Sequence, residues 1–111
     1  PICDIVSLHR EAAAEVLIGE EELNKMKKGA ALINVSRASL VDEVALLEAI
    51  DAEHIMFAAL DVFENEPQPS IHTLMHPALS LSPHIAGSTQ ESLARIGQEV
   101  VGIIQNLKAN F

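Results

Sequence analysis

Three short segments of this chain carry residue types that together can bind a carboxylate and move a proton. The segments are Asn34-Val35-Ser36-Arg37, Asp61-Val62-Phe63-Glu64-Asn65-Glu66-Pro67 and Pro83-His84-Ile85-Ala86-Gly87. Each of them follows an apolar run of the kind that forms a buried strand. Because ligands of open α/β sheets bind outside the carboxyl ends of the strands, we expect Arg37, Glu66 and His84 to share one edge of a sheet.

The three side chains have complementary chemistry. Arg37 can hold a substrate carboxylate with its planar fork of donors, which a lysine cannot reproduce. His84 can exchange a proton with a hydroxyl or carbonyl oxygen near neutral pH. Glu66 follows Asp61 by five residues, close enough to fold back toward His84. A carboxylate bonded to one ring nitrogen would fix the tautomer of the histidine and favour its charged form.

Each residue also has a purely structural interpretation, which the sequence leaves open. An arginine after a strand is often a surface ion-pair partner, and a loop glutamate is usually solvated. A histidine that follows a proline often packs within a loop. Because the three residues occur together on successive strand ends, a functional site and three unrelated surface residues are about equally favoured interpretations.

Other reactive residue types lack the partners that their chemistry requires. His72 and His76 have the i, i+4 spacing of helical metal ligands, but they lie between prolines and have no acidic or thiol ligand at suitable spacing. We therefore expect no metal site. Cys3 has no basic residue nearby to activate it. The 111 residues contain neither a G-x-G-x-x-G motif nor a P-loop.

Four apolar runs predict the strands that position these segments: 5–8, 30–35, 56–62 and 79–82. Their nearly continuous apolar character is typical of a parallel sheet covered on both faces. Residues 20–28 have acids first and lysines last, as a helix dipole favours, and residues 42–50 form a second predicted helix with Asp42 as N-cap. Residues 64–77 contain three prolines and are predicted to be a loop. The order indicates an α/β fold of βαβ units with helices flanking the sheet.

The clearest predicted helix is the last one. Ser88 and Glu91 have the spacing of a capping box. One apolar face then recurs at spacings of three and four residues: Leu93, Ile96, Val100, Ile103, Ile104 and Leu107. A helix of about 20 residues spans roughly 30 Å. This is long for a four-stranded sheet, so we expect another domain to cover part of that face.

Composition excludes several classes of partner. The chain has 111 residues, enough for one domain at most, and a net charge of −9. That charge repels phosphates, so we expect neither nucleic acid nor an anionic membrane as a partner. Cys3 is the only cysteine, which indicates a reducing compartment. No apolar run approaches the roughly 20 residues of a membrane span, and we expect a cytoplasmic location.

Taken together, these segments resemble the D-isomer-specific 2-hydroxyacid dehydrogenases, over about residues 4–110. The matching stretches are 31–37 with 41–46, 58–67 and 82–89. The stretches 87–91 and 96–100 are most similar to the D-3-phosphoglycerate dehydrogenase branch. The resemblance implies that residues 1–111 are the second half of a Rossmann-type NAD-binding domain. The half with the glycine-rich loop, and the substrate-binding domain, would be missing.

The resemblance also implies a role for each site residue. Arg37 would bind the substrate carboxylate, His84 would be the acid–base group at C2, and Glu66 would support it. Asp61 would contact the nicotinamide amide of NAD. The backbone of two short stretches would line the same cofactor, with the residues Val35, Ser36, Arg37, His84, Ile85, Ala86 and Gly87. The substrate would be a 2-hydroxy acid or 2-oxo acid of the 3-phosphoglycerate, hydroxypyruvate or glyoxylate type.

Several features depart from that family. The chain begins with Pro1, directly before a strand-like run, so we expect a fragment left by truncation or cleavage. The stretch after His9 is shorter than usual and lacks its proline. Ala38 replaces a usual glycine, which requires a negative φ or some strain.

Three interpretations therefore remain open. The chain is the chemical half of a dehydrogenase with little activity alone, a non-enzymatic binding or assembly module of the same fold, or a truncated remnant. In each case, an open sheet edge and an apolar helix face favour self-association or pairing with the missing part of the enzyme.

Overall fold

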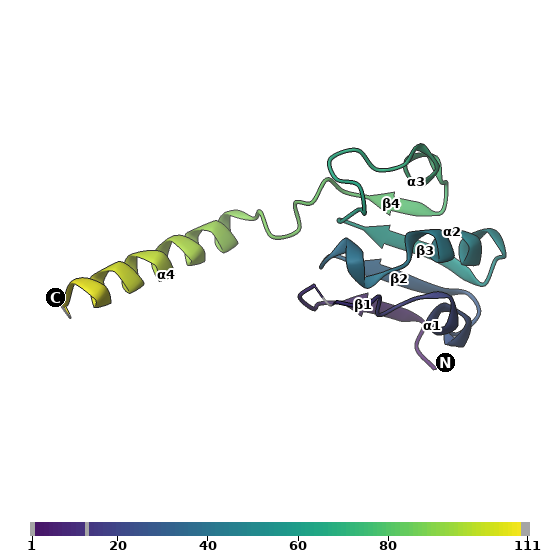
Figure 1. The fold of residues 1–111 in the computed structure, drawn as a ribbon, viewed down its shortest axis with the longest axis horizontal. Coiled ribbons are helices and arrows are strands. Elements are labelled where there is room, and N and C mark those ends of the chain that lie inside the picture. The colour runs from purple at the N-terminus through teal and green to yellow at the C-terminus, as the bar shows by residue number, and fades with distance from the viewer. Residues whose placement is uncertain (1, 13, 110–111) are drawn as a thin grey trace.

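A single parallel sheet forms the body of the protein. The computed structural model describes residues 2–12 and 14–109. The strands β1 (Ile5–Leu8), β2 (Ala30–Asn34), β3 (Ile55–Leu60) and β4 (Leu79–Leu81) lie in the order β1-β2-β3-β4. All three pairings are parallel, so the four carboxyl ends point the same way (Figure 1). The predicted strands and the α/β class are confirmed, with strand ends shifted by one or two residues.

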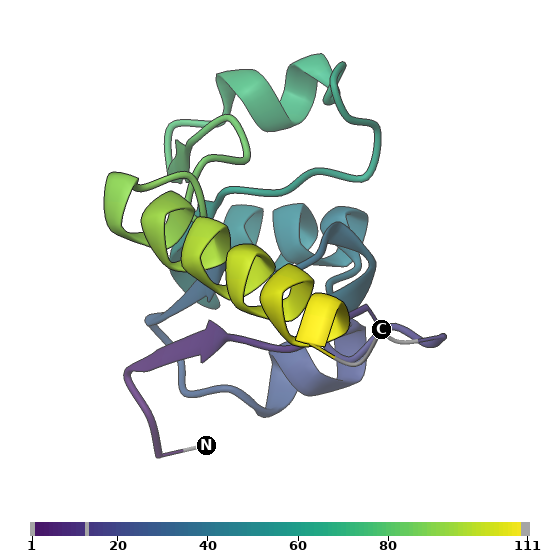
Figure 2. The same ribbon diagram turned by 90° about the vertical axis from the view of Figure 1, so that its left-hand side faces the viewer.

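Helices cover one face of this sheet. The helices α1 (Glu20–Lys25) and α2 (Glu43–Asp51) pack together on the face to which Leu32 of β2 contributes, and Figure 2 shows them on one side of the strands. The other face is open in the described residues, where Ile5 is 62% and Phe57 37% exposed. The expectation of a sheet covered on both faces is therefore not met within this part of the chain.

The first two helices begin where the sequence predicts and differ at their ends. The Asp42 carboxylate accepts a hydrogen bond from the N–H of Ala45 at 3.0 Å, which confirms it as the N-cap of α2. However, α1 ends at Lys25 instead of continuing to residue 28. The chain leaves the helix at Met26, whose backbone is extended. It then turns into β2 at Gly29, which adopts a φ of +82° and donates its N–H to the carbonyl of His54.

A short helix, α3 (Ile71–Met75), lies within the stretch predicted to be a loop. Ser70 caps it by accepting the N–H of Thr73 at 3.1 Å. The buried hydroxyl of Thr73 in turn donates to the carboxylate of Glu43 on α2. The prolines on both sides concealed this helix, while the serine cap was a usable signal.

The last helix, α4 (Gln90–Ala109), extends away from the sheet (Figure 1). Its cap is not Ser88, as predicted, but Thr89, whose hydroxyl accepts the N–H of Ser92 at 3.1 Å. Ser88 instead closes a turn by donating its N–H to the carbonyl of Ile85. No described residue of α4 is buried, and the six residues of its predicted apolar face are 49–60% exposed.

Neither α4 nor any other helix in residues 2–12 and 14–109 is long and apolar enough to cross a membrane.

Candidate active site

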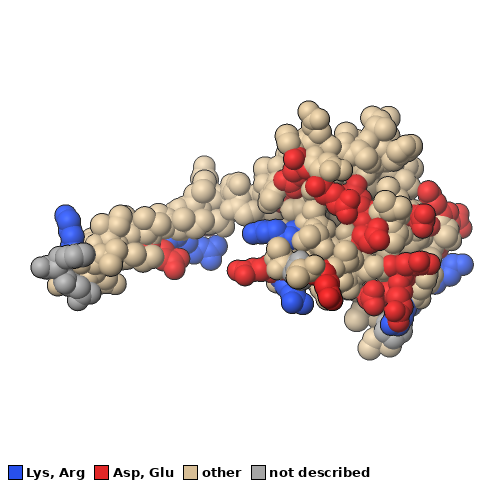
Figure 3. Space-filling model, in the orientation of Figure 1, with Lys and Arg blue, Asp and Glu red and all other residues tan. Residues whose placement is uncertain are grey.

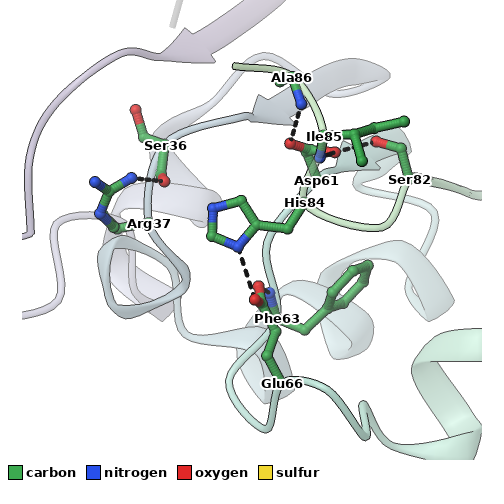
Figure 4. Close-up of polar contacts among 9 residues, drawn as sticks. All are labelled: Ser36, Arg37, Asp61, Phe63, Glu66, Ser82, His84, Ile85 and Ala86. Atoms are coloured by element: carbon green, nitrogen blue, oxygen red, sulfur yellow. Dashed lines mark hydrogen bonds and ion pairs between the residues drawn. The ribbon is translucent and has the colours of Figure 1, made fainter. Parts of the chain in front are cut away.

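The carboxyl ends of the strands bring the predicted site residues together. Arg37 follows β2, Asp61 directly follows β3, and His84 follows β4. Glu66 returns from the loop after β3 to meet His84. Figure 4 shows these side chains around one region of the sheet edge. The grouping of an arginine, a glutamate and a histidine at this edge is therefore present in the structure.

Glu66 and His84 form a hydrogen-bonded pair. Nδ1 of His84 lies 2.7 Å from Oε2 of Glu66, and Oε1 of Glu66 accepts the N–H of Phe63 at 2.9 Å. The bond from His84, followed by the one from Phe63, lowers the pKa of Glu66 below its ordinary value. An ionised Glu66 can only accept, so Nδ1 carries the proton of the neutral ring and Nε2 is left as the acceptor.

The remaining ring nitrogen is directed into the site. In Figure 4 the ring edge that carries Nε2 faces the side on which Arg37 lies. A substrate held by the guanidinium of Arg37 would present its neighbouring oxygen to this nitrogen. The arrangement suits proton exchange with the oxygen on a carbon next to a carboxylate.

Asp61 anchors the segment that carries the histidine. Its buried carboxylate, 2% exposed, accepts three hydrogen bonds: at Oδ1 from the hydroxyl of Ser82 (2.6 Å) and the N–H of Ile85 (3.0 Å), and at Oδ2 from the N–H of Ala86 (2.8 Å). Burial alone raises the pKa of Asp61, but these bonds and the nearby His84 together lower it below its ordinary value. Asp61 thus fixes the backbone on both sides of His84.

That backbone is unusual, because His84 has a φ of 55°. Among the described residues other than glycine, only His84 and Glu53 have a positive φ. The left-handed conformation of His84 turns its side chain toward Glu66 while the next two N–H groups turn toward Asp61. Ala38 is free of such strain, since it begins a short 3₁₀ turn, η1 (Ala38–Leu40).

A buried asparagine for which no role was predicted, Asn34, shapes the turn that carries Arg37. The side chain of Asn34 accepts the N–H of Ser36 at 3.1 Å and donates to the carbonyl of Arg37 at 3.0 Å. An asparagine at the end of an apolar run is a known turn signal and could have indicated this role. The Arg37 guanidinium donates to the carbonyl of Ser36 at 2.7 Å and is otherwise exposed.

The hydroxyl of Ser36 ties two strand ends together. It donates to the carbonyl of Leu8 at 3.0 Å and accepts the N–H of Arg10 at 2.8 Å. The other predicted cofactor-lining residues lie at the same edge. Val35 is half-buried, Ile85 and Ala86 are exposed although their N–H groups bond to Asp61, and Gly87 is exposed. Their contacts with a cofactor remain predictions.

An apolar cavity of about 430 Å³ adjoins the Glu66–His84 pair. Its lining is mostly apolar and comes from the ends of β3 and β4 and from α3: Phe63, Glu66, Pro67, Pro69, Leu74, Leu81, Ser82, Pro83 and His84. Among the described residues, no lysine or arginine lines it. The charged ligand groups that Arg37 would bind therefore belong outside this cavity.

The described residues contain no group of three or more histidine, cysteine, aspartate or glutamate side chains that could hold a metal ion. In particular, His76 bonds to Asp51 at 3.1 Å and to the N–H of Ala78, while His72 lies on the exposed surface of α3.

Residues 1–86 match the model of the D-isomer specific 2-hydroxyacid dehydrogenase NAD-binding domain. The chain belongs to this family. The family's domain binds NAD, and the open strand ends are where such sheets hold a dinucleotide. Residues 84–87 and Arg37 are exposed, which leaves room for it.

Curated relatives carry several names within the family. The chain is 38% identical over 110 residues to the D-3-phosphoglycerate dehydrogenase of Bacillus subtilis, covering 94% of the chain and 21% of that protein. It is 41% identical over 106 residues to the enzyme of that name from Escherichia coli, covering 89% and 26%. It is 47% identical over 98 residues to the glyoxylate reductase of Thermofilum pendens, covering 86% and 29%. The chain thus spans less than a third of these relatives.

Solved structures of the family share the fold. A glyoxylate reductase from Paecilomyes thermophila superposes with a TM-score of 0.84 and 36% identity, over 92% of this chain and 32% of that one. The NAD-complexed D-isomer specific 2-hydroxyacid dehydrogenase from Lactobacillus delbrueckii ssp. bulgaricus gives 0.85 and 30%, over 96% and 38%. The suspected family and the NAD cofactor are confirmed.

Proposed function

We propose that this chain provides the acid–base and substrate-binding residues of an NAD-dependent oxidoreductase that interconverts a D-2-hydroxy acid and a 2-oxo acid. The observation that carries the proposal is the Glu66–His84 pair at 2.7 Å, with the second ring nitrogen directed toward the side of Arg37. The relatives named phosphoglycerate dehydrogenase and glyoxylate reductase support a substrate of the 3-phosphoglycerate, hydroxypyruvate or glyoxylate type.

The residues divide the chemistry between them. Arg37 binds the carboxylate through its planar donors and orients the adjacent C2 oxygen toward His84. In the reducing direction, Nε2 of His84 gives its proton to this oxygen as the carbonyl becomes a hydroxyl. Glu66 stabilises the charged ring that precedes this transfer. The bound cofactor would supply the hydride to C2 as NADH, or accept it from C2 as NAD⁺.

The test transfers this chain into the matching segment of the Escherichia coli relative and follows NADH formation with 3-phosphoglycerate. His84→Ala should lower kcat by about 10²–10⁴-fold, the usual contribution of an acid–base group. Arg37→Lys should mainly raise KM, because a lysine cannot make the paired contact. His72→Ala, on the exposed surface of α3, is the matched control and should leave both constants unchanged. A folded chimera in which His84→Ala keeps full activity would refute the assignment.

The 111 residues by themselves should turn over little or no substrate, since they contain no glycine-rich phosphate loop. A steady-state assay with NADH and hydroxypyruvate or glyoxylate checks this expectation. Turnover at an ordinary enzymatic rate of about 1–10³ s⁻¹ would contradict it.

We also propose that the apolar face of α4 is covered in the cell, by a second copy or by the remaining part of the enzyme. Its six large apolar residues are each about half exposed, an unusual extent for a protein surface.

The lone exposed Cys3 supports a reducing, cytoplasmic location.

A further inference from the structure

We propose that Arg10 binds a phosphate group at the β1 side of the site, and that this group belongs to the pyrophosphate of the dinucleotide. The proposal rests on the binding of NAD and is independent of the acid–base roles of Glu66 and His84. It adds a charged contact to the site, one strand beyond Arg37.

The backbone of Arg10 lies beside Ser36 and is hydrogen-bonded to it. The last pair of the β1–β2 ladder is Leu8 with Asn34, and Arg10 and Ser36 each lie two residues beyond it. The N–H of Arg10 donates to the hydroxyl of Ser36 at 2.8 Å, and this hydroxyl donates to the carbonyl of Leu8 at 3.0 Å. Arg10 and Arg37 therefore begin from neighbouring strand ends.

The guanidinium of Arg10 is available to a ligand. Arg10 is exposed, and within residues 2–12 and 14–109 no carboxylate lies within ion-pair distance of it. In contrast, Lys25 and Lys27 each pair with a carboxylate at 2.5 Å. Figure 3 shows blue side chains beside red ones at the edge toward which the strands point. Arg10 and Arg37 supply positive charge at this edge, in a chain whose net charge of −9 otherwise repels an anion.

The strand order indicates which phosphate Arg10 meets. The strands lie in the order β1-β2-β3-β4, about 4.8 Å apart, and Arg10, Arg37 and His84 follow β1, β2 and β4. The reacting carbon must lie between Arg37 and His84. Beyond His84, the cavity next to β4 is apolar and has no cation in its lining. A bound dinucleotide therefore has to direct its two charged phosphates the other way, across the end of β1, where Arg10 lies.

Arginine suits such a contact because its planar fork binds two phosphate oxygens at once. The phosphate of a phosphorylated substrate offers the same chemistry, and the probes below separate the two sources. The experiment uses the 111-residue chain with ¹⁵N-labelled backbone and measures dissociation constants by NMR titration. The probes are ADP-ribose, which has the pyrophosphate without nicotinamide, nicotinamide riboside, which has no phosphate, and 3-phosphoglycerate.

ADP-ribose should shift the amide signals of Arg10 and Ser36. Arg10→Ala should weaken its binding by about tenfold, as expected for one charge-assisted contact, and Arg10→Lys should restore part of the affinity. Nicotinamide riboside should bind equally to all variants. Arg95→Ala removes an exposed arginine of α4 and is the matched control. Preserved amide dispersion in each variant shows that it is folded.

Three outcomes would overturn the proposal. They are no binding of ADP-ribose to the unsubstituted chain at millimolar ligand, equal binding to the Arg10→Ala variant, and a loss of affinity confined to 3-phosphoglycerate. The last outcome would assign Arg10 to the substrate phosphate. The acid–base assignment is tested separately, by the activity of the His84→Ala chimera, so its failure is recognised independently of ADP-ribose binding.

Discussion

His84 keeps its left-handed backbone because one buried carboxylate holds the residues on both sides of it. Such a conformation costs on the order of 1–3 kcal/mol for a residue with a Cβ atom. The three hydrogen bonds to Asp61, from Ser82, Ile85 and Ala86, offset this cost. At this scale, Asp61 is a positioning residue for the histidine, whatever contact it also makes with the cofactor.

Replacing Asp61 by asparagine should lower the free energy of unfolding by about 1–3 kcal/mol. The asparagine side chain keeps one acceptor oxygen, but its NH₂ group replaces the other. The N–H group of Ile85 or Ala86 that faces this NH₂ group then has no acceptor. Urea unfolding measures the change. Asp51→Asn is the control, because Asp51 pairs with His76 at the surface, and it should change stability by less than about 0.5 kcal/mol. Equal effects of the two substitutions would show that Asp61 is not an anchor.

The stability of the protein should fall in acid because Asp61 and Glu66 become protonated. The pKa values of Asp61 and Glu66 are lowered from ordinary values of 3.8 and 4.5. A carboxyl whose pKa is lowered by folding stabilises the protein above its ordinary pKa, and this stabilisation disappears as pH falls through the lower folded value. Urea midpoints should therefore decline below about pH 4.5. The decline should be smaller in Asp61→Asn and Glu66→Gln, and an unchanged decline in both would contradict the prediction.

At the scale of elements, the ends of the helices show where local sequence is a sufficient guide. Asp42 was predicted as the cap of α2 because its spacing to the first turn is unambiguous. At α4, two candidate caps, Ser88 and Thr89, stand side by side, and the capping-box pattern of Ser88 with Glu91 pointed one residue too early. Ser88 is occupied by the turn that begins at Ile85, a turn that depends on Asp61.

Thr89→Ala should therefore reduce the stability of the first turn of α4 by about 1 kcal/mol, since the N–H of Ser92 loses its acceptor. Amide hydrogen exchange over residues 90–93 measures this loss. Ser88→Ala is the matched control, and exchange there should stay nearly unchanged. The reverse result would restore Ser88 as the cap.

The site illustrates the same limit. The sequence was sufficient to predict that Arg37, Glu66 and His84 meet at one sheet edge, because parallel strands align their carboxyl ends. It was not sufficient to predict the bonds of Asp61 to residues 82–86, the positive φ of His84, or the bonds of Asn34. The bonds of Asp61 depend on how segments 20 or more residues apart pack together. The bonds of Asn34 depend on the detailed geometry of a single turn. The helix α3 was missed because it is only five residues long and has prolines on both sides.

At the scale of the whole molecule, the body and α4 differ sharply in burial. The body encloses a mainly aliphatic core, whereas no described residue of α4 is buried. The molecule measures 61 × 29 × 24 Å as a result. An extended helix with one apolar face is stable in water mainly when that face is packed against something.

Val100 lies within the apolar face, and Val100→Glu should weaken self-association by about tenfold or more, because an unpaired carboxylate is costly to bury. Sedimentation velocity over a range of concentrations measures it. Gln98→Glu adds the same charge about 200° around the helix from Val100, outside the apolar face. It should have little effect on self-association. A monomer at all concentrations without any substitution would exclude a second copy as the partner of α4.

The bonds to Asp61 have a consequence for the exchange of hydrogen with solvent. Ile85 and Ala86 lie in an exposed segment, where amide hydrogens are normally replaced by deuterium within seconds, yet both donate to a buried carboxylate. These two amides should exchange slowly, against the rapid exchange of their surroundings. Slow exchange of these two amides would show, in the absence of any substrate, that the loop holds His84 in its observed conformation.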